Sequence, residues 1–319
     1  MNPHVLILSS LYDLGTDEIT YWLDRLNVPF VRLNREHFPE YRLALDPLGP
    51  SMRVRGWGET HEIGDSLQAI LFRQPVFLRN TPAQSLTPDE QLSRSQWQAF
   101  LRGLSVFERA AWMNRPASTY LAESKPYQLA VARQCGFLVP ETLVTNDVER
   151  IQGYLPAEIA IKSVDTVLLY DQEEALFSFT RAVSSSALSE SSLSRAPVTA
   201  QRLLEPKVDL RVTVVGDRTF AVKILSNGRG VAGDWREAEP SSLEYVDAHL
   251  PKGIQDCCRA LMCRLGLNFG GLDLAETPNG IYFVEVNPTG EWSWLSNAQR
   301  PIGPAIADWL ANPPRNCSV

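Results

Sequence analysis

Apolar and polar positions near the start of the chain predict a strand, a helix and a second strand. Residues 4–10 read HVLILSS, a continuous apolar run that is typical of a buried strand. Between Ile19 and Leu26 the apolar residues fall on one helical face, and Thr16 is the expected N-cap. The segments VPFVRLN and AILFRQP read as further strands. Short connections predict a βαβ unit and an α/β N-terminal domain, and the first turn lacks the GxGxxG motif of dinucleotide sites.

Two helices are expected before the next group of strands. The first begins at a capping box, in which Thr87 caps the helix, Pro88 occupies its first turn and Glu90 bonds back to the cap. The second covers about Lys125–Cys135 and stops at Gly136. The segment MNRPAST between them is expected to be a linker.

The second half of the chain is predicted to consist mainly of strands. The Ser-rich stretch from Ser184 to Pro197 interrupts them and is expected to be a mobile loop, or otherwise a solvated linker. One helix, Gly253–Leu265, is expected with Gly266 as its C-cap. The expected strands are EIAIKSV (158–164), TVLLYD (166–171), ALFSFTRAV (175–183), VTAQRLL (198–204), DLRVTVVGDRTFAVKIL (209–225) and the hairpin in GGLDLAETPNGIYFVEVNPTGEWSWL (270–295).

That last hairpin carries three oxygen-bearing side chains on otherwise apolar strands. Side chains alternate between the two faces of a strand, so Glu285 and Asn287 point the same way. A three-residue loop (PNG, 278–280) would pair Asp273 with Glu285, whereas a two-residue loop (NG) would turn Asp273 to the opposite face. Pro followed by Asn and Gly suits a type I turn with a G1 bulge, so we expect the three-residue loop.

These three residues form a candidate metal site. Two adjacent carboxylates repel each other and burial adds to the repulsion, but a hard cation such as Mg²⁺ removes it and prefers oxygen ligands. We therefore interpret Asp273, Glu285 and Asn287 as metal ligands. The alternative is an exposed sheet face with ordinary polar residues.

Composition and charge limit the class of protein. Of the 319 residues, 44% are hydrophobic and 21% are charged, as in globular proteins of two or three structural units. A net charge of -7 argues against a broad nucleic-acid-binding surface. Five cysteines without a CxxC pair indicate neither a zinc site nor a disulfide framework, and the N-terminal apolar run is too short for a signal peptide or a membrane span. We expect a reduced, cytoplasmic protein that binds neither nucleic acid nor membrane.

Several other residues fit the binding of a nucleotide, each with an ordinary alternative. Lys125 lies at a helix start, and Lys162 lies in an apolar strand, where an ammonium group needs an anion such as phosphate or a salt-bridge partner. The QRLL segment, 201–204, can offer backbone groups to a flat heterocycle, as any strand end can. Arg211 faces away from its apolar neighbours, into a pocket or into solvent.

In this order, the two lysines, the QRLL strand end and the Asp…Glu-x-Asn hairpin resemble the ATP-grasp superfamily. Those enzymes hold ATP between two α+β subdomains, with two lysines on the phosphates, a hinge at the adenine and an Asp/Glu-x-Asn set for Mg²⁺. The resemblance implies Mg²⁺ ligands at Asp273, Glu285 and Asn287. It implies nucleotide-binding residues at Lys125, Lys162, Gln201, Arg202, Leu203, Leu204 and Asp209.

A narrower resemblance covers most of the chain. The chain is similar to the microviridin-type ligases, also called graspetide synthetases or ATP-grasp ribosomal peptide maturases, in the segments VRLNREHFP, WMNRPASTYLAESKPYQLA, GFLVPETLVTND, DLRVTVVGDRTFAVKI, GDWRE and EVNPTGEWSWL. This implies an ATP-grasp fold of α/β and α+β parts with an N-terminal βαβ (pre-ATP-grasp) domain. The implied units are an N-terminal domain (1–115), a central subdomain with the phosphate-side lysines and the Ser-rich loop (116–200), and a C-terminal subdomain with the Mg²⁺ site (201–319).

The implied activity is the cross-linking of a ribosomal precursor peptide, leader plus core, with ATP and Mg²⁺ as cofactors. An Asp or Glu side chain of the peptide is activated as an acyl-phosphate, and a Ser or Thr hydroxyl or a Lys amine of the same peptide attacks it. Arg211 and Arg236 are the expected cations for the incoming carboxylate, because Arg holds carboxylate and phosphate oxygens in a fork. The alternative for each is a surface salt bridge, with Asp209 or Asp234. A homodimer is a family expectation.

Two other functions stay open. One is an ATP-grasp ligase that joins a free amino acid or amine to a peptide or small carboxylic acid, and the other is a nucleotide- and peptide-binding scaffold without catalysis. One feature departs from the superfamily, which usually carries a Gly-rich loop over the phosphates, because no glycine occurs between Tyr154 and Val215. A closing element would have to come from SVDTVLLYD (163–171) or from the Ser-rich stretch. Trp292 and Trp294 are expected to pack in the core, with a peptide platform as the alternative.

Overall fold

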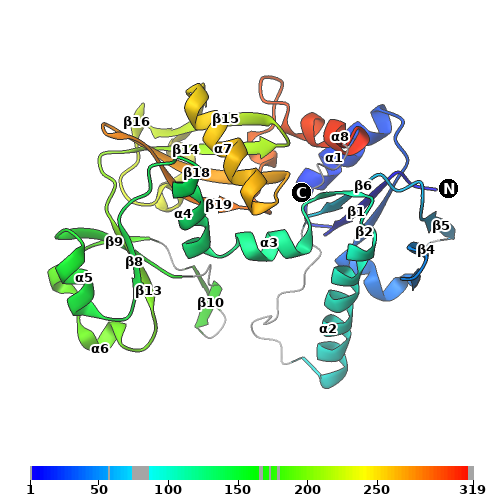
Figure 1. Cartoon of the computed structure of the whole chain (residues 1–319), viewed down its shortest axis with the longest axis horizontal. Coiled ribbons are helices and arrows are strands. Elements are labelled where there is room, and N and C mark those ends of the chain that lie inside the picture. The colour runs from blue at the N-terminus through cyan, green and yellow to red at the C-terminus, as the bar shows by residue number, and fades with distance from the viewer. Residues whose placement is uncertain are drawn as a thin grey trace.

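The structure is a computed structural model that describes residues 2–314, apart from Trp57 and residues 74–85, 165–167, 172–173 and 178–179. Its strands are parallel in the N-terminal sheet and antiparallel in the sheets that follow (Figure 1). The predicted mixture of α/β and α+β parts is therefore confirmed. No helix in these residues is long and apolar enough to cross a membrane.

The N-terminal part consists of β1 (Val5–Ser9), α1 (Leu14–Arg25), β2 (Phe30–Asn34), η1 (Arg35–Glu40), β6 (Ala69–Phe72), α2 (Pro88–Gly103), η2 (Leu104–Val106) and β7 (Ala111–Met113). The strands form a parallel sheet in the order β2-β1-β6-β7, which confirms the predicted βαβ unit. Alternate residues of β1 pack on opposite faces of this sheet. Val5 and Ile7 face α1, whereas Leu6 and Leu8 face α2.

A small sheet that the sequence interpretation missed covers the α2 side of the N-terminal sheet. Its strands are β3 (Arg42–Asp46), β4 (Ser51–Gly56) and β5 (Glu59–Ile63), paired antiparallel. Met52 and Val54 of β4 are buried in the same core as Leu6 and Leu8, and the alternate residues Ser51, Arg53 and Arg55 are exposed.

Helix ends follow the predicted signals with one exception. The capping box of Thr87 and Glu90 is confirmed, and Gly266 ends a helix in the left-handed conformation at φ 66°. The predicted N-cap Thr16 is wrong, because the Asp13 side chain accepts from Thr16 N at 3.3 Å and starts α1 earlier. Asp13 is itself a strong capping residue.

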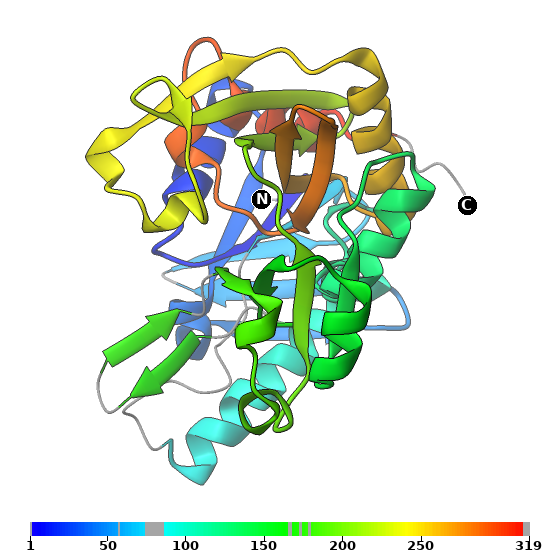
Figure 2. The ribbon, with the colours of Figure 1, turned by 90° about the vertical axis from the view of Figure 1, so that its left-hand side faces the viewer.

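The central part consists of β8 (Thr142–Thr145), α5 (Val148–Tyr154), β9 (Glu158–Lys162), β10 (Leu168–Asp171), β11 (Glu174–Phe177), β12 (Arg181–Ser184), η3 (Ser185–Ala187), α6 (Glu190–Leu193) and β13 (Val198–Arg202). An antiparallel sheet has the order β12-β9-β13-β8, and β10 and β11 form a separate hairpin (Figure 2). Part of the Ser-rich stretch is regular structure and not the expected loop, because η3 and α6 lie in it. Leu193 of α6 is buried against Ile151 and Ile159.

The predicted strand over 166–171 and the proposed closing segment over 163–171 fall partly outside the described residues.

The C-terminal part consists of α3 (Pro116–Ala122), α4 (Lys125–Gln134), β14 (Val208–Val215), β15 (Arg218–Ser226), β16 (Arg229–Gly230), η4 (Trp235–Glu237), η5 (Pro240–Ser242), β17 (Leu243–Ala248), α7 (Lys252–Leu265), β18 (Phe269–Thr277), β19 (Gly280–Asn287), η6 (Ser293–Leu295) and α8 (Ile302–Ala311). Its antiparallel sheet has the order β16-β15-β14-β18-β19, with β17 paired to β15. Helices α3, α4 and α7 share a core with one face of this sheet. In this sheet β19 is the last strand on the side of α4.

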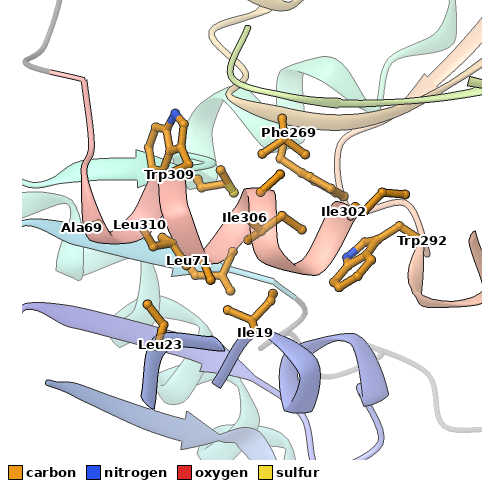
Figure 3. Close-up of a cluster of buried hydrophobic side chains, with 14 of the residues drawn as sticks. Ile19, Leu23, Ala69, Leu71, Phe269, Trp292, Ile302, Ile306, Trp309 and Leu310 are labelled. Atoms are coloured by element: carbon orange, nitrogen blue, oxygen red, sulfur yellow. The ribbon is translucent and has the colours of Figure 1, made fainter. Parts of the chain in front are cut away.

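The last helix, α8, returns to the N-terminal sheet (Figure 3). Its residues Ile302, Ile306 and Leu310 are buried in one cluster with α1 and β6. Phe269 and Trp292 belong to the same cluster, so the segment after β19 is fixed between the two sheets. The sequence interpretation did not predict this helix, although it joins the two ends of the chain in one core.

Candidate active site

The β18–β19 hairpin pairs Asp273 with Glu285, as predicted, but not through the predicted turn. Thr277 pairs with Gly280, so the loop is a two-residue Pro-Asn loop and the expected three-residue loop is wrong. A bulge then shifts the register by one residue after Asp273 and leaves Val284 as the extra residue of β19. Bulges re-aim side chains and are common next to active sites. This one brings the two carboxylates onto the same face.

Two arginines neutralise Asp273. Its Oδ1 accepts a hydrogen bond from Arg211 Nη1 at 2.9 Å, and its Oδ2 accepts one from Arg236 Nη2 at 2.7 Å. Burial alone would raise the pKa of Asp273, but the two guanidinium groups outweigh burial and hold it below its usual range. Asp273 is therefore ionised at neutral pH.

Glu285 forms ion pairs with a lysine and with one of the same arginines, Arg236. Its Oε2 lies 3.2 Å from Lys125 Nζ, and its Oε1 lies 3.6 Å from Arg236 Nη2. Asn287, two residues further along β19, accepts a hydrogen bond at Oδ1 from the backbone N–H of Thr289 at 3.0 Å. The predicted helix-start lysine and the predicted metal ligands therefore lie side by side.

Lys162, at the end of β9, is an ammonium group in a poorly solvated position. Burial lowers its pKa to about 8, and Lys125 acts in the same direction, while Glu285 opposes the shift. An anion beside Lys162 would reverse this shift, because it would stabilise the protonated form. A lowered pKa of this kind is expected of a lysine that binds a phosphate group.

The predicted hinge segment ends β13 and enters the link to β14. The Gln201 side chain is buried and donates to Thr142 Oγ1 at 2.8 Å, and Arg202 pairs with Glu141 at 2.8 Å. Both side chains are thus used within the central sheet. The half-buried Leu203 and the residue after it are left to face a ligand.

Asp209, on β14, forms an ion pair with Lys207, two residues before it. Burial raises the pKa of the Asp209 carboxyl, and Lys207 opposes that shift. The alternative from the sequence, a salt bridge between Asp209 and Arg211, is wrong, because Asp209 pairs with Lys207 and Arg211 pairs with Asp273.

One cavity of about 370 Å³ gathers nearly all of these residues between the central and the C-terminal sheets. Of the predicted set it is lined by Lys125, Lys162, Gln201, Arg202, Leu203, Leu204, Asp209, Arg236, Asp273, Glu285 and Asn287. The remaining predicted residue, Arg211, does not line it. Its guanidinium group lies behind Asp273 and also donates to the Glu291 carbonyl at 3.3 Å.

Two glycines make room for Arg211. A Cβ at Gly271 or at Gly290 would collide with the Arg211 guanidinium group, so larger residues at either position would displace it. Arg211 is thus the buried ion-pair partner of Asp273, while Arg236, with a side chain 40% exposed, is its partner on the cavity side.

Three buried polar residues around the site were missed by the sequence interpretation. Arg73 donates to Asp13 at 3.1 Å and to Glu291 at 2.9 Å, and so ties the N-terminal sheet to the segment after β19. Asn114 donates to the carbonyls of Phe269 and Pro288, and Gln128 bonds to the backbone of β19. The available signals were weak: Arg73 follows the apolar strand AILF, and Gln128 follows Lys125 by one helical turn.

The two tryptophans after β19 differ in burial. Trp292 is 1% exposed and lies in the core, as expected, but Trp294 is 41% exposed, so the core prediction is wrong for it. Trp294 packs on Tyr245 at 4.8 Å between ring centroids and on Trp235 at 6.2 Å. Trp235 in turn lines the cavity, and Arg236 stacks over its ring. An aromatic cluster therefore borders the cavity.

The donor set fits a hard divalent cation. Asp273, Glu285 and Asn287 offer two carboxylates and an amide oxygen at one end of the hairpin, which are ligand types that Mg²⁺ prefers. Within the part of the chain that the structure describes, no group of three His, Cys, Asp or Glu side chains could hold a metal ion. The candidate site therefore depends on Asn287 as a third ligand.

Fold and cavity together define a protein of the ATP-grasp ligase class. Three solved structures share the fold over nearly the whole chain. The macrocyclase MdnC of Microcystis aeruginosa, bound with precursor peptide MdnA, is 26% identical with a TM-score of 0.82 over 98% of this chain and 100% of that one. A RiPP-associated ATP-grasp ligase of Chryseobacterium gregarium, in complex with ADP and a leader and core peptide, is 22% identical with a TM-score of 0.83 over 99% and 98%. The ligase PsnB, complexed with a phosphomimetic precursor variant, Mg and ADP, is 22% identical with a TM-score of 0.75 over 97% of each chain.

These comparisons confirm the resemblance to the ATP-grasp ligases of ribosomal peptides. No family model and no curated protein matches the chain.

Proposed function

We propose that this chain is an ATP- and Mg²⁺-dependent ligase that cross-links a ribosomally made precursor peptide into a macrocycle. The observation that carries the proposal is the single cavity in which two lysines, the end of β13 and the acidic pair of the hairpin meet. The similarity to ligases that were solved with ADP, Mg and precursor peptides supports it. Neither alternative function has an observation in its favour.

In this proposal two groups of residues neutralise the phosphates of ATP. Lys125 and Lys162 would contribute their positive charges, and Asp273, Glu285 and Asn287 would hold Mg²⁺ beside them. Bound Mg²⁺ supplies charge stabilisation for the phosphates during transfer. The residues 201–204 form the hinge beside the adenine, with Asp209 nearby in the cavity.

The reaction has two steps that balance without an oxidant or reductant. First, a carboxylate oxygen of a peptide Asp or Glu attacks the γ-phosphorus of ATP, which forms an acyl-phosphate and releases ADP. Second, a Ser or Thr hydroxyl or a Lys amine of the same peptide attacks the acyl carbon. Phosphate leaves, the attacking group loses its proton to solvent or base, and an ester or amide ring closes.

The two arginines have different roles in this mechanism. Arg236 is partly exposed in the cavity and can leave Asp273 to meet the incoming peptide carboxylate, for which a guanidinium fork is suited. Arg211 is buried, does not line the cavity, and keeps Asp273 ionised and oriented, so we assign it to the support of the metal ligand instead of the acceptor role expected from sequence.

We also propose the division along the chain into units 1–115, 116–200 and 201–319, with α3 and α4 of the second unit packed on the sheet of the third. We propose action in the cytoplasm, where ATP and a newly made peptide meet. A homodimer remains a prediction.

The decisive experiment measures the intact mass of a candidate precursor, encoded beside this gene, after incubation with the protein, Mg²⁺ and ATP. Loss of one water per cross-link, with ADP formed, is the expected result, and fragmentation then locates the rings. Lys162→Met should abolish the change, whereas Lys252→Met, the same substitution at an exposed helix start, should not.

Two outcomes would contradict the proposal. ADP formed only when a free amine is added would indicate an intermolecular ligase. Binding of ADP and peptide without any mass change, with several neighbouring precursors tested, would indicate a scaffold.

A further inference from the structure

Gln128 is a buried amide that pairs with the backbone between two candidate metal ligands. It lies on α4, is 2% exposed, and accepts a hydrogen bond at Oε1 from Val286 N at 2.9 Å. Its Nε2 donates to the Val286 carbonyl at 2.7 Å and also to the Ala122 carbonyl. One side chain therefore holds both the N–H and the C=O of a single residue.

The residue held in this way is Val286, which lies between Glu285 and Asn287. Its side chain is buried in the core of the C-terminal sheet, so its neighbours on either side turn to the opposite face, toward the cavity. Because β19 is the last strand of its sheet, the outward N–H and C=O of Val286 have no further strand to pair with. Gln128 takes the place of that strand.

The same helix also reaches the acidic side chain. Lys125 and Gln128 are three residues apart, which places them on one helical face. Lys125 Nζ lies 3.2 Å from Glu285, so α4 contacts the ligand pair through the side chain of one ligand and through the peptide that joins it to the other. These two contacts, at the Glu285 side chain and at the Val286 backbone, restrict the movement of α4 relative to β19.

Asn114 completes the support at the other end of the segment. Its Nδ2 donates to the Pro288 carbonyl at 3.0 Å and to the Phe269 carbonyl at 2.8 Å. The backbone on both sides of Asn287 is thus held by buried amide side chains from outside the hairpin.

We infer that Gln128 is a positioning residue that sets the spacing of Glu285 and Asn287 and thereby the affinity for the Mg²⁺–nucleotide complex. The inference rests on the proposed metal site. Groups that orient metal ligands without touching the metal commonly change its affinity by about 10- to 100-fold when they are removed. Gln128 acts through the backbone of β19 and does not itself line the cavity.

The test compares ADP binding by calorimetry in excess Mg²⁺ and in a chelator. Gln128→Met keeps the side-chain length and removes the amide, and Gln134→Met is the matched control, because it is the same substitution at an exposed position of the same helix. We expect Gln128→Met to weaken ADP binding by about 10-fold or more in Mg²⁺ and to leave it unchanged in the chelator. Gln134→Met should behave as the wild type in both.

A second variant covers the case in which Gln128→Met does not fold. Gln128→Asn keeps a neutral amide on a side chain that is one methylene shorter, so it should reach the Val286 backbone less well, and a loss of affinity, again only with Mg²⁺, is expected. Equal losses with and without Mg²⁺ would show a general structural role and overturn the inference, as would an unchanged affinity.

If the wild type itself gains nothing from Mg²⁺, the metal site and the inference fail together. The mass assay of the proposed function reads out peptide cross-linking separately, so the two failures can be told apart.

Discussion

Replacing Lys162 with methionine should stabilise the protein without ligand while it abolishes nucleotide binding. Methionine is similar in length and carries no charge, so it removes the cost of holding an ammonium group in a poorly solvated place. The pKa of Lys162 falls from 10.5 to about 8 in the folded protein, mainly through burial. At about 1.4 kcal/mol per pKa unit this corresponds to about 3 kcal/mol.

The sign of the pH dependence follows from proton binding. Below pH 8 both the folded and the unfolded chain carry the proton on Lys162, so the full cost is present. Between pH 8 and 10.5 the unfolded chain keeps the proton and the folded chain loses it, so the stability of the wild type rises with pH relative to Lys162→Met. The difference should fall from about 3 kcal/mol at pH 7 to about 1 kcal/mol at pH 10.

Urea unfolding of both proteins at several pH values measures this difference. A variant that is equally stable or less stable at pH 7, or a difference that does not shrink as pH rises, would refute the reasoning. Lys252→Met again serves as the control, since its exposed side chain should give no pH-dependent difference. Added Mg²⁺ and ADP should reverse the order of stability, because only the wild type gains from ligand binding.

Four further substitutions test the acidic pair and its supports. Gly271→Ala should push Arg211 away from Asp273 and lower the free energy of unfolding, measured in urea, by about 1–3 kcal/mol. A variant with the stability and activity of the wild type would show that the Arg211 guanidinium group can accommodate the added methyl group. Asp273→Ala should abolish Mg²⁺-dependent turnover and also cost about 3–5 kcal/mol, because it leaves the buried Arg211 without its carboxylate, whereas Glu285→Ala should abolish turnover with little loss of stability. Comparable stability losses in these two variants would contradict this difference. Arg236→Ala should still bind ADP but yield no cross-linked peptide, and a normal yield by mass spectrometry would exclude the acceptor role.

The stability loss expected for Asp273→Ala distinguishes the two carboxylates, although the sequence presents them as an equivalent pair. The structure separates the two, because Asp273 is paired with a buried arginine and Glu285 with groups that solvent can reach.

The sequence by itself determined the features that depend on neighbours in the chain. The capping box at Thr87 and the left-handed Gly266 were predicted correctly, because they involve contacts within one or two helical turns. The common face of Glu285 and Asn287 follows from strand alternation alone. Lys162 stood out because a charge inside an apolar strand is costly wherever that strand packs.

The tertiary structure decided what depends on the pairing of distant segments. The sequence predicted a three-residue turn, whereas the hairpin has a two-residue turn and a bulge at Val284 that brings Asp273 opposite Glu285. Only the pairing of the two strands shows this bulge. The placement of Arg211 behind Asp273 required two glycines from other segments, and Gln128 could be connected with Val286 only after α4 had packed on β19. Local propensity depends on a few adjacent residues. These contacts instead arise when whole helices and strands pack against one another, and no single stretch of the sequence specifies that packing.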